Sequence, residues 1–458
     1  MRLAKLLLSA CLVPALAFAD DAALETAAAL RAQALADDTA WNVVESLTTE
    51  VGPRLAGSEA DARAVAWAQA KFEELGYDRV WIEPVTFPKW ERRSESAQVL
   101  GVNAQPLLVT ALGGSPGGTV EAGIVRFDSL DALKAAPAGS LEGKIAFVDY
   151  RMERARDGSG YSHGSAVRGR GPSEAIRKGA VGFLMRSAGT SAHRVANTGI
   201  TRFDEGLSPV PSAALSLPDA DQLARLLAQG PVRVRISLDC GWDGEYTSHN
   251  VIGEITGREA PQEVVLLGAH LDSWDLGTGA IDDASGIGIT MAAGHLVRQL
   301  PQRPRRSIRV VAFANEEQGL LGGREYARRH ATDVARHVIA VESDFGAGRI
   351  YGFNTSGGES GAVARIAGAL APLGIAQMPG KGGPGPDISP LAAIGGAWAW
   401  LGQDGSRYFD LHHNADDTLD KIDPADLAQN AAAYAVFAWL AAESGADFGS
   451  KAKAPAAD

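Results

Sequence analysis

Cysteine is scarce in this sequence: Cys11 and Cys240 are the only two among 458 residues. A chain with so few thiols is not a disulfide scaffold, so its stability must come from a hydrophobic core and any bound metal. If Cys11 leaves with the N-terminal segment discussed below, Cys240 has no partner for an intrachain disulfide.

Positively charged residues are fewer than negatively charged ones. The 43 lysine and arginine residues are outnumbered by 55 aspartate and glutamate residues, which gives a formal net charge of -12. This balance argues against a general nucleic-acid-binding protein. Hydrophobic residues make up 46% of the chain, so wholesale disorder is excluded and a packed core is expected.

The N-terminus has the order of features that is typical of a secretory signal peptide. Arg2 and Lys5 precede the apolar segment Leu6–Leu16, which is followed by the small-residue sequence Ala17–Ala19. The apolar segment is too short for a membrane span. We therefore expect cleavage after this segment and export to the periplasm or the extracellular space. A lipoprotein anchor at Cys11 is the less favoured alternative, because this cysteine comes so early.

The length predicts two domains after a signal peptide at residues 1–19. Residues 20–108 and 246–446 alternate helical and strand patterns, so we expect one discontinuous α/β domain with a mixed, mostly parallel sheet flanked by helices. Residues 109–245 have short strand patterns and few helical ones, which predicts an inserted β-rich domain. Residues 447–458 are predicted to be a flexible tail.

Several elements can be bounded from their periodicity. In the insertion, the Gly-, Ser- and Arg-rich segment 151–170 is predicted to be a lid-like loop and Pro172–Lys178 a helix. The predicted strands are Tyr77–Phe87, Val232–Leu238, His249–Ile255, Val264–His270, Ser307–Ala314 and His337–Glu342. The predicted helices of the α/β domain include Ser285–Leu300, Leu320–His330 and Pro424–Glu443.

Residue types that bind metals follow three consecutive predicted strands. They are His270, then Glu316 and Glu317, then Asp344; Asp282 and Asp283 lie in an intervening turn, and His412 and His413 come later. The carboxyl ends of parallel strands meet at one edge of a sheet, so these distant side chains are expected to converge.

This set of side chains suits a two-metal hydrolytic site, in which two cations share a water and a bridging carboxylate. We assign Asp282 as the bridge. His270 and Asp344 are assigned to one ion, and Glu317 and His413 to the other. Imidazole with carboxylate favours zinc, with cobalt and manganese left open, so the cofactor prediction is two Zn2+ per chain.

Two further acids have predicted roles beside the metals. Glu316 is not needed as a ligand and is predicted to be the general base, because a carboxylate near two cations can relay a proton to a leaving amine. Asp272 follows His270 by two residues and is expected on the same side of an extended segment. We predict that it accepts the other imidazole N–H, which fixes the tautomer.

Five motifs occur in order in the second half of the chain: Gly268–Ser273, Gly279–Gly286, Asn315–Gly323, Glu342–Asp344 and His413–Thr418. Together they resemble the co-catalytic zinc aminopeptidase family, and within it the carboxypeptidase Q branch. The resemblance implies the zinc-peptidase fold, a protease-associated-type insertion and a cis peptide bond between Asp282 and Asp283. It also implies a tyrosine near the metals as an oxyanion partner, for which Tyr408 is the nearest candidate. Related enzymes are often dimers, so a homodimer is possible.

One motif departs from the family pattern. The last motif of the family is usually His-Thr-x-x-Asp-Thr, and here Asn414 follows His413 in place of threonine. His412 is a competing ligand, although His413 is the residue that aligns.

The expected activity is that of an exported di-zinc exopeptidase that acts on small peptides as an aminopeptidase or dipeptidase. The resemblance favours dipeptides with a free N-terminus. One alternative is a single-zinc amide hydrolase or glutaminyl cyclase on the same scaffold. A binding module without catalysis is a third hypothesis, but no expected ligand is missing from the sequence.

Gly160–Gly164 matches the G-x-S-x-G pattern of serine hydrolases. That nucleophile elbow must follow a buried strand, whereas this segment follows a polar loop. The sequence therefore disfavours a serine hydrolase.

Overall fold

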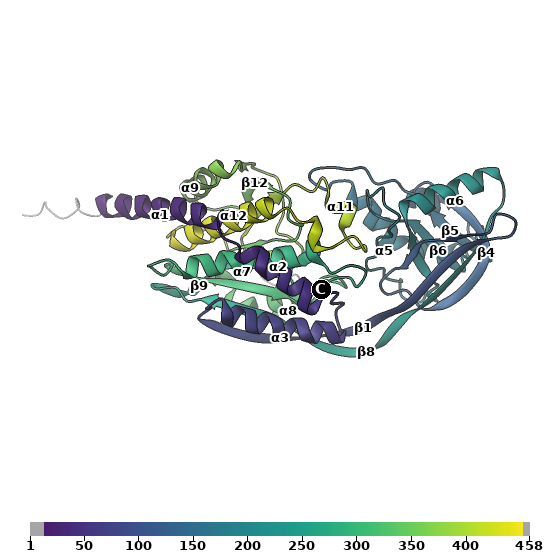
Figure 1. The fold of residues 1–458 in the computed structure, drawn as a ribbon, viewed down its shortest axis with the longest axis horizontal. Helices are drawn as coiled ribbons and strands as arrows, with labels where there is room; N and C mark the ends of the chain where they lie inside the picture. Colours follow the sequence, from purple (N-terminus) through teal and green to yellow (C-terminus); the bar gives the residue numbers. More distant parts are fainter. Residues whose placement is uncertain (1–12, 452–458) are drawn as a thin grey trace, which may run out of the picture.

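The structure is a computed structural model that describes residues 13–451. Helix α1 (Val13–Ala34) is the first described element, so Cys11 and most of the predicted signal peptide lie outside the described residues. Figure 1 shows an elongated molecule, with α1, α7, α9 and α12 toward one end and α5, α6 and β4–β6 at the other. Among residues 13–451, no helix combines the length and apolarity that a membrane crossing requires.

The end that contains α7 and α12 is built on a mixed, mostly parallel sheet. Its strand order is β13-β12-β14-β11-β9-β10-β8, with β9, β10, β11 and β14 parallel to one another. β8 is antiparallel to β10, and β12 is antiparallel to β14 but parallel to β13. The strands are β8 (Arg233–Ile255), β9 (Ala260–His270), β10 (Arg306–Phe313), β11 (His337–Glu342), β12 (Ile350–Thr355), β13 (Ala376–Gln377) and β14 (Trp398–Gln403).

Helices cover both faces of this sheet because side chains alternate along each strand. On β9, Val265 and Leu267 pack into the core beneath α7 and α12, whereas Val264 and Leu266 pack into the core that contains Tyr326 of α8. The helices of this domain are α2 (Thr39–Ser46), α3 (Glu59–Glu74), α7 (Ser285–Arg298), α8 (Leu321–Arg329), α9 (Ser360–Leu370), α10 (Ser389–Ala393), α11 (Tyr408–Leu411) and α12 (Pro424–Glu443). The predicted α/β class with a mostly parallel, helix-flanked sheet is confirmed.

Two strands are much longer than the sequence predicts. β1 (Arg79–Leu100) and β8 pair antiparallel along their whole length, from Arg79 opposite Glu254 to Leu100 opposite Arg233. Proline, glycine and charge in their middle parts favoured shorter strands, and β8 was predicted as two. Because each strand supplies the other with hydrogen-bond partners, the pair extends beyond the core as a ribbon that leads into the insertion (Figure 1).

The insertion continues the same sheet in the order β8-β4-β5-β6-β7-β3, with β4 to β7 parallel. It has two hydrophobic cores that differ from those around β9, and one of them also contains Leu55 and Trp274 of the α/β domain. Its elements are β2 (Gln105–Leu107), β3 (Val109–Ala111), β4 (Gly118–Phe127), α4 (Leu130–Ala135), β5 (Lys144–Val148), α5 (Tyr161–Arg177), β6 (Gly182–Arg186), β7 (Ser212–Leu215) and α6 (Leu217–Gln229).

Helix α5 corrects the prediction for this region, because it begins at Tyr161 and not at Pro172. Half of the predicted loop 151–170 is therefore helical. Its Gly- and Ser-rich sequence has weak helix propensity, but burial of Val167 and Ala175 in the insertion core stabilises the helix.

The predicted tail also starts too early. Phe448 is buried in the core of the α/β domain, and Ala397 N donates to Ser450 Oγ at 2.7 Å. Residues 447–451 are thus packed, and residues 452–458 lie outside the described part of the chain.

Candidate metal centre

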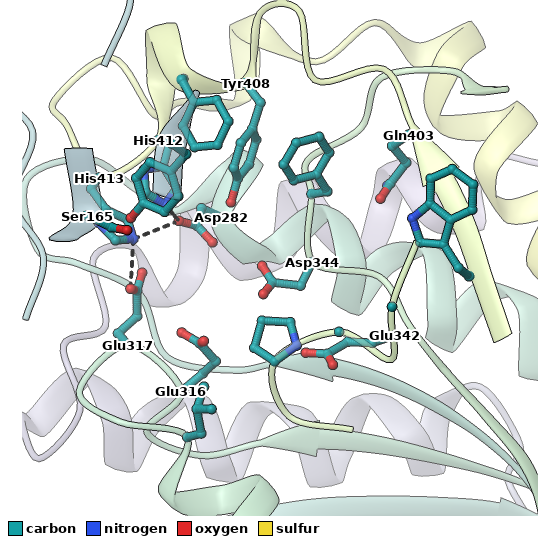
Figure 2. A pocket seen from close by; sticks show the side chains of 18 of the residues that line it. Ser165, Asp282, Glu316, Glu317, Glu342, Asp344, Gln403, Tyr408, His412 and His413 are labelled. Atoms are coloured by element: carbon teal, nitrogen blue, oxygen red, sulfur yellow. Dashed lines mark ion pairs between the residues drawn. The ribbon is translucent and has the colours of Figure 1, made fainter. Parts of the chain in front are cut away.

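The predicted ligands converge at the carboxyl edge of the parallel sheet. His270 is the last residue of β9, Glu317 follows β10, and Asp344 follows β11. Because β9 lies between β10 and β11 in the sheet, the three side chains come from adjacent strand ends. His413 approaches from the loop after α11, as Figure 2 shows.

Two groups of ligand atoms share the carboxylate of Asp282. In one group, His270 Nε2 lies 3.0 Å from Asp282 Oδ1 and 3.4 Å from Asp344 Oδ1. In the other, His413 Nε2 lies 3.2 Å from Asp282 Oδ2 and 2.8 Å from Glu317 Oε2. The two oxygens of one carboxylate therefore face two different donor sets, which is the arrangement of a bridging ligand.

The donor set fits two divalent cations. Asp282 Oδ2 and Glu317 Oε1 are buried and have no hydrogen-bond partner within the described residues. Burial raises the pKa of Glu317 and of Asp344, so their ionised forms need compensation by positive charge. Burial also opposes ionisation of Asp282, but contacts with His270 and His413 hold the pKa of this carboxyl well below its usual range.

The turn that presents Asp282 is fixed by two residues to which the sequence analysis assigned no role. Asp417 accepts hydrogen bonds from the backbone N–H groups of Ile281 at 2.6 Å and Asp282 at 3.2 Å. The fully buried Arg54 donates to the carbonyls of Thr278 at 2.8 Å and Gly279 at 2.9 Å. Asp417 belongs to a quoted motif, whereas Arg54 lies more than 200 residues away and gave no local signal.

The peptide bond between Asp282 and Asp283 is cis, as predicted. The side chain of Asp283 accepts hydrogen bonds from His270 N at 3.1 Å and Gly286 N at 3.0 Å. This acid supports the strand end and the first turn of α7.

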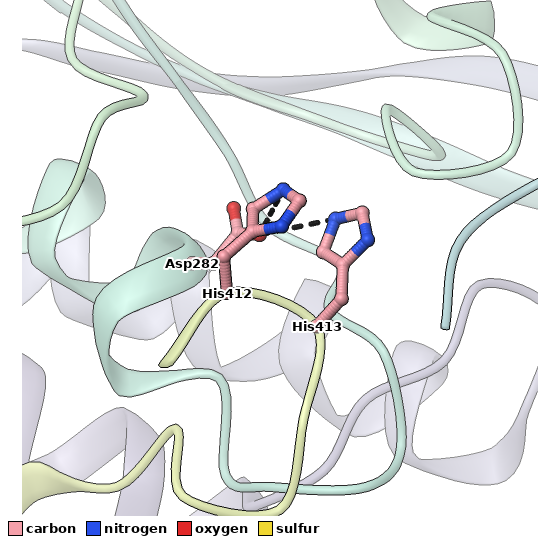
Figure 3. A group of neighbouring side chains, drawn as sticks. All are labelled: Asp282, His412 and His413. Carbon is pink, nitrogen blue, oxygen red and sulfur yellow. Dashed lines mark ion pairs between the residues drawn. The ribbon is translucent and has the colours of Figure 1, made fainter. Parts of the chain in front are cut away.

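The two neighbouring histidines are not equivalent. Their rings stack with centroids 3.5 Å apart, and both face Asp282 (Figure 3), but His412 Nε2 is 3.6 Å from Asp282 Oδ2 and is the more distant. His413 Nδ1 donates to the carbonyl of Thr198 at 3.2 Å, which leaves Nε2 free for an ion. The geometry favours His413, although His412 also lies within a possible ligand group.

The two histidines also differ in the direction in which their pKa values are shifted. Burial holds the pKa of His412 well below its usual value. Burial also opposes protonation of His413, but the carboxylates of Glu317 and Asp282 raise its pKa to about 10. Of the two imidazoles, His413 therefore has the stronger electrostatic interaction with the carboxylates of Glu317 and Asp282.

The predicted contact of the Asp272 carboxylate is wrong. His270 Nδ1 lies 2.9 Å from the backbone carbonyl of Asp272, whereas the nearer carboxylate oxygen is 3.8 Å away. The carboxylate instead accepts hydrogen bonds from Glu316 N at 2.9 Å and Glu317 N at 3.4 Å. The extended segment bends enough for its main chain to reach the imidazole, so Asp272 positions the Glu316–Glu317 loop.

The substitution Asp272→Asn is expected to lower kcat/KM by about 10- to 100-fold, the usual cost of losing a group that orients ligands. An amide offers one acceptor oxygen to the two N–H groups, so the loop loses one of its anchors. Steady-state kinetics with zinc content measured in parallel tests this. The exposed Asp243→Asn is the control, and a change below twofold for Asp272→Asn contradicts the assigned role.

Glu316 and Tyr408 line a cavity of about 690 Å3 beside the ligand groups. Figure 2 shows the Glu316 carboxylate and the Tyr408 hydroxyl directed into this space from opposite sides. Burial raises the pKa of Glu316 well above its usual value, and Asp344 and Glu317 add to this effect. Burial and the nearby Asp282 likewise keep Tyr408 protonated by raising its pKa. Neither residue belongs to the two donor sets that share Asp282.

The cavity lies between the two parts of the molecule. Tyr161, Ser165 and Arg168 of α5 line it from the insertion, and aromatic side chains line it from the α/β domain. These are Phe345, Tyr351, Trp400 and Phe409. The segment predicted as a lid therefore forms a wall of the cavity, partly as a helix. The serine of the G-x-S-x-G sequence, Ser162, lies exposed in the first turn of this helix and not at a strand end.

The chain is similar in sequence to known peptidases. The model of "Peptidase family M28" matches residues 250–438. Carboxypeptidase Q from Bos taurus is 32% identical over 415 residues, covering 89% of this chain and 86% of that relative. Human carboxypeptidase Q shows the same identity and coverage.

Solved structures extend the match to the whole fold. A peptidase M28 precursor from Shewanella amazonensis is 50% identical, with a TM-score of 0.91, covering 94% of this chain and 98% of that one. A zinc aminopeptidase from Bacillus subtilis has a TM-score of 0.64 at 19% identity and covers 91% of this chain and 98% of its own, which supports the fold alone.

Proposed function

The chain belongs to peptidase family M28, and from this premise we propose that it is an exported di-zinc exopeptidase of small peptides. Membership makes it a metallopeptidase and a hydrolase. The proposal adds the number of ions, the size of the substrate and the location. The observation that carries it is the shared Asp282, whose two oxygens face separate donor sets.

We assign one ion to His270, Asp282 and Asp344 and the other to Asp282, Glu317 and His413. When bound, such zinc ions supply an electrophile for the scissile carbonyl and lower the pKa of water. Three carboxylates in this set balance most of the charge of two divalent ions, and Glu316 beside them supplies a fourth. The same balance supports two ions over the single ion of the alternative amide hydrolase or cyclase.

The remaining chemistry belongs to side chains of the chain itself. Glu316 is directed into the cavity, where its carboxylate accepts a proton from water and returns it to the leaving nitrogen. The Asp272 carboxylate holds the backbone N–H of Glu316 and so fixes the base. The Tyr408 hydroxyl keeps its proton and can donate to the negative charge that develops on the carbonyl oxygen.

The size and position of the cavity favour small substrates. Its volume of about 690 Å3 falls in the range of small-molecule sites. The insertion covers one side: Thr198 N donates to the carbonyl of His413 at 2.9 Å, and Arg154 forms an ion pair with Asp410 at 2.6 Å. We further assign residues 109–245 as a protease-associated-type domain.

The proposed function is tested by incubating the zinc-loaded mature protein with a dipeptide and tripeptide library and identifying the products by mass spectrometry. The expected result is release of the N-terminal residue, with blocked N-termini resistant. Internal cleavage of long peptides, or no cleavage of any peptide, would contradict the proposal. Sequencing of the N-terminus of protein secreted by a bacterial host tests the export component.

A further inference from the structure

The backbone of the assigned ligand His413 has an unusual conformation. Its φ is 61°, and among the described residues only two others that carry a side chain, Asn315 and Leu320, have positive φ. In this conformation the Cβ atom crowds the following carbonyl oxygen, so it persists only where surrounding contacts hold it. The contacts that hold the loop after α11 are therefore part of what presents His413 to an ion.

Asn197 and Thr198 of the insertion supply three such contacts. Asn197 Nδ2 donates to the carbonyl of His412 at 2.6 Å, and Thr198 N donates to the carbonyl of His413 at 2.9 Å. The imidazole Nδ1–H of His413 donates to the carbonyl of Thr198 at 3.2 Å. Two consecutive residues of the insertion thus fix both the main chain and the ring of a ligand that belongs to the α/β domain.

These two residues are themselves fixed to the sheet of the insertion. Asn197 is 2% exposed, and its backbone N donates to Ser187 Oγ, just after β6, at 2.8 Å. Ser187 Oγ donates in turn to the carbonyl of Leu215, the last residue of β7, at 2.7 Å. Thr198 Oγ1 donates to the carbonyl of Ala111 in β3 at 2.7 Å. Hydrogen bonds therefore connect three strands of the insertion to the segment that holds the ligand.

The two donor sets differ in where their support comes from. In one set, His270 Nδ1 bonds to the main-chain carbonyl of Asp272 within the α/β domain at 2.9 Å. In the other set, the insertion holds His413 and also contacts the chain beside Glu317, because Arg202 Nη2 donates at 3.2 Å to the carbonyl of the residue after that acid. A change in the seating of the insertion is therefore expected to disturb one donor set and to leave the other in place.

We propose that Asn197 and Thr198 are positioning residues for His413, through which the insertion sets the affinity of the ion assigned to Glu317 and His413. The inference rests on the two-ion centre of the proposed function. Groups that orient a ligand imidazole change metal affinity by about 10- to 100-fold. Thr198 acts through its main chain, so the side chain of Asn197 is the one on which the proposal can be tested.

The test measures the two zinc dissociation constants of Asn197→Ala by competition with a chromophoric chelator. The constant of the ion at Glu317 and His413 is expected to rise by about 10- to 100-fold, because the hydrogen bond to the carbonyl of His412 is lost. The constant of the other ion should stay within threefold of wild type. Two backgrounds assign the ions: the effect should persist in Asp344→Asn and be absent in Glu317→Gln.

Gly189→Ala reaches the same carboxamide from inside the insertion. A Cβ atom at Gly189 would lie 2.8 Å from Asn197 Oδ1, so the carboxamide must shift, although the loop that binds the ion is untouched. This variant is expected to weaken the same ion by at least about threefold. The double variant should bind that ion no more weakly than Asn197→Ala, because alanine at 197 leaves room for the new methyl group. Asn103→Ala, exposed in the insertion, is the control and should match wild type.

Thermal unfolding of the metal-free variants separates loss of this support from loss of fold, and Gly189→Ala decides the test if Asn197→Ala does not fold. Equal weakening of both ions in Asn197→Ala would overturn the proposal. So would a constant for the ion at Glu317 and His413 that stays within twofold of wild type in both variants. A wild type that binds a single ion would instead count against the two-ion centre of the proposed function.

Discussion

Glu316→Gln is expected to lower kcat by about 10^2- to 10^4-fold, the range for loss of a general base. Glutamine has nearly the same volume and fills the same place in the cavity, but its amide cannot accept the proton. Because Glu316 belongs to neither of the donor sets that share Asp282, zinc content should be unchanged. KM should change little, since the same contacts to a bound peptide are available.

The neighbouring Glu317→Gln separates base from ligand. Glu317 Oε2 lies 2.8 Å from His413 Nε2, so this variant should lose affinity for one ion as well as activity. The exposed Glu73→Gln is the matched control and should behave as wild type. A Glu316→Gln enzyme with kcat within threefold of wild type would remove Glu316 from the role of base.

Removal of metal by dialysis against a strong chelator is expected to lower activity by more than about 10^3-fold, because the electrophile and the activated water are both lost. The apo protein should also unfold at a temperature lower by about 5 °C or more, since a ligand at 100-fold its Kd stabilises by about 2.7 kcal/mol. Four carboxylates around one cavity then face each other without cations. The measurements are residual kcat and a thermal scan of apo and holo protein.

Zinc added back should restore both activity and the unfolding temperature, whereas magnesium should not, because imidazole ligands suit zinc better. Full activity after exhaustive chelation, with zinc content below detection, would contradict a metal-dependent reaction. An unchanged unfolding temperature would contradict the inference that the buried acids need cations.

The site was predictable where one strand supplies one ligand at its end. His270, Glu317 and Asp344 follow apolar runs whose pattern and length also fix the strands, and β11 begins and ends at the predicted residues. Because these strands pair in parallel, their carboxyl ends lie at the same edge of the sheet, and no other contact has to be known to place the ligands together. For the same reason the mostly parallel sheet and its flanking helices followed from the sequence.

Contacts that depend on the backbone path were not predictable. The Asp272 carboxylate turns to the Glu316 and Glu317 amides because the carbonyl of Asp272 already satisfies His270. Thr198 orients His413 through its main chain, which has no side-chain signature in the sequence. Long-range partners of this kind are set by tertiary packing alone.

Extended elements outside the cores were also missed. The middle parts of β1 and β8 contain proline, glycine and many charges, and only their mutual pairing keeps them extended. Helix α5 is stabilised by the side chains it buries and not by its local propensity. These elements place the insertion against the metal centre. The wall of the cavity that the insertion forms could therefore not be predicted from the sequence.

The zinc content of purified, zinc-saturated protein, measured by mass spectrometry of the metal after removal of free ion, tests the shared role of Asp282 most directly. The account predicts two ions per chain for the wild type and a loss of both in Asp282→Asn, whereas Asp344→Asn should keep the ion of Glu317 and His413. A wild type that binds only one ion, or an Asp282→Asn protein that still binds two, would contradict it.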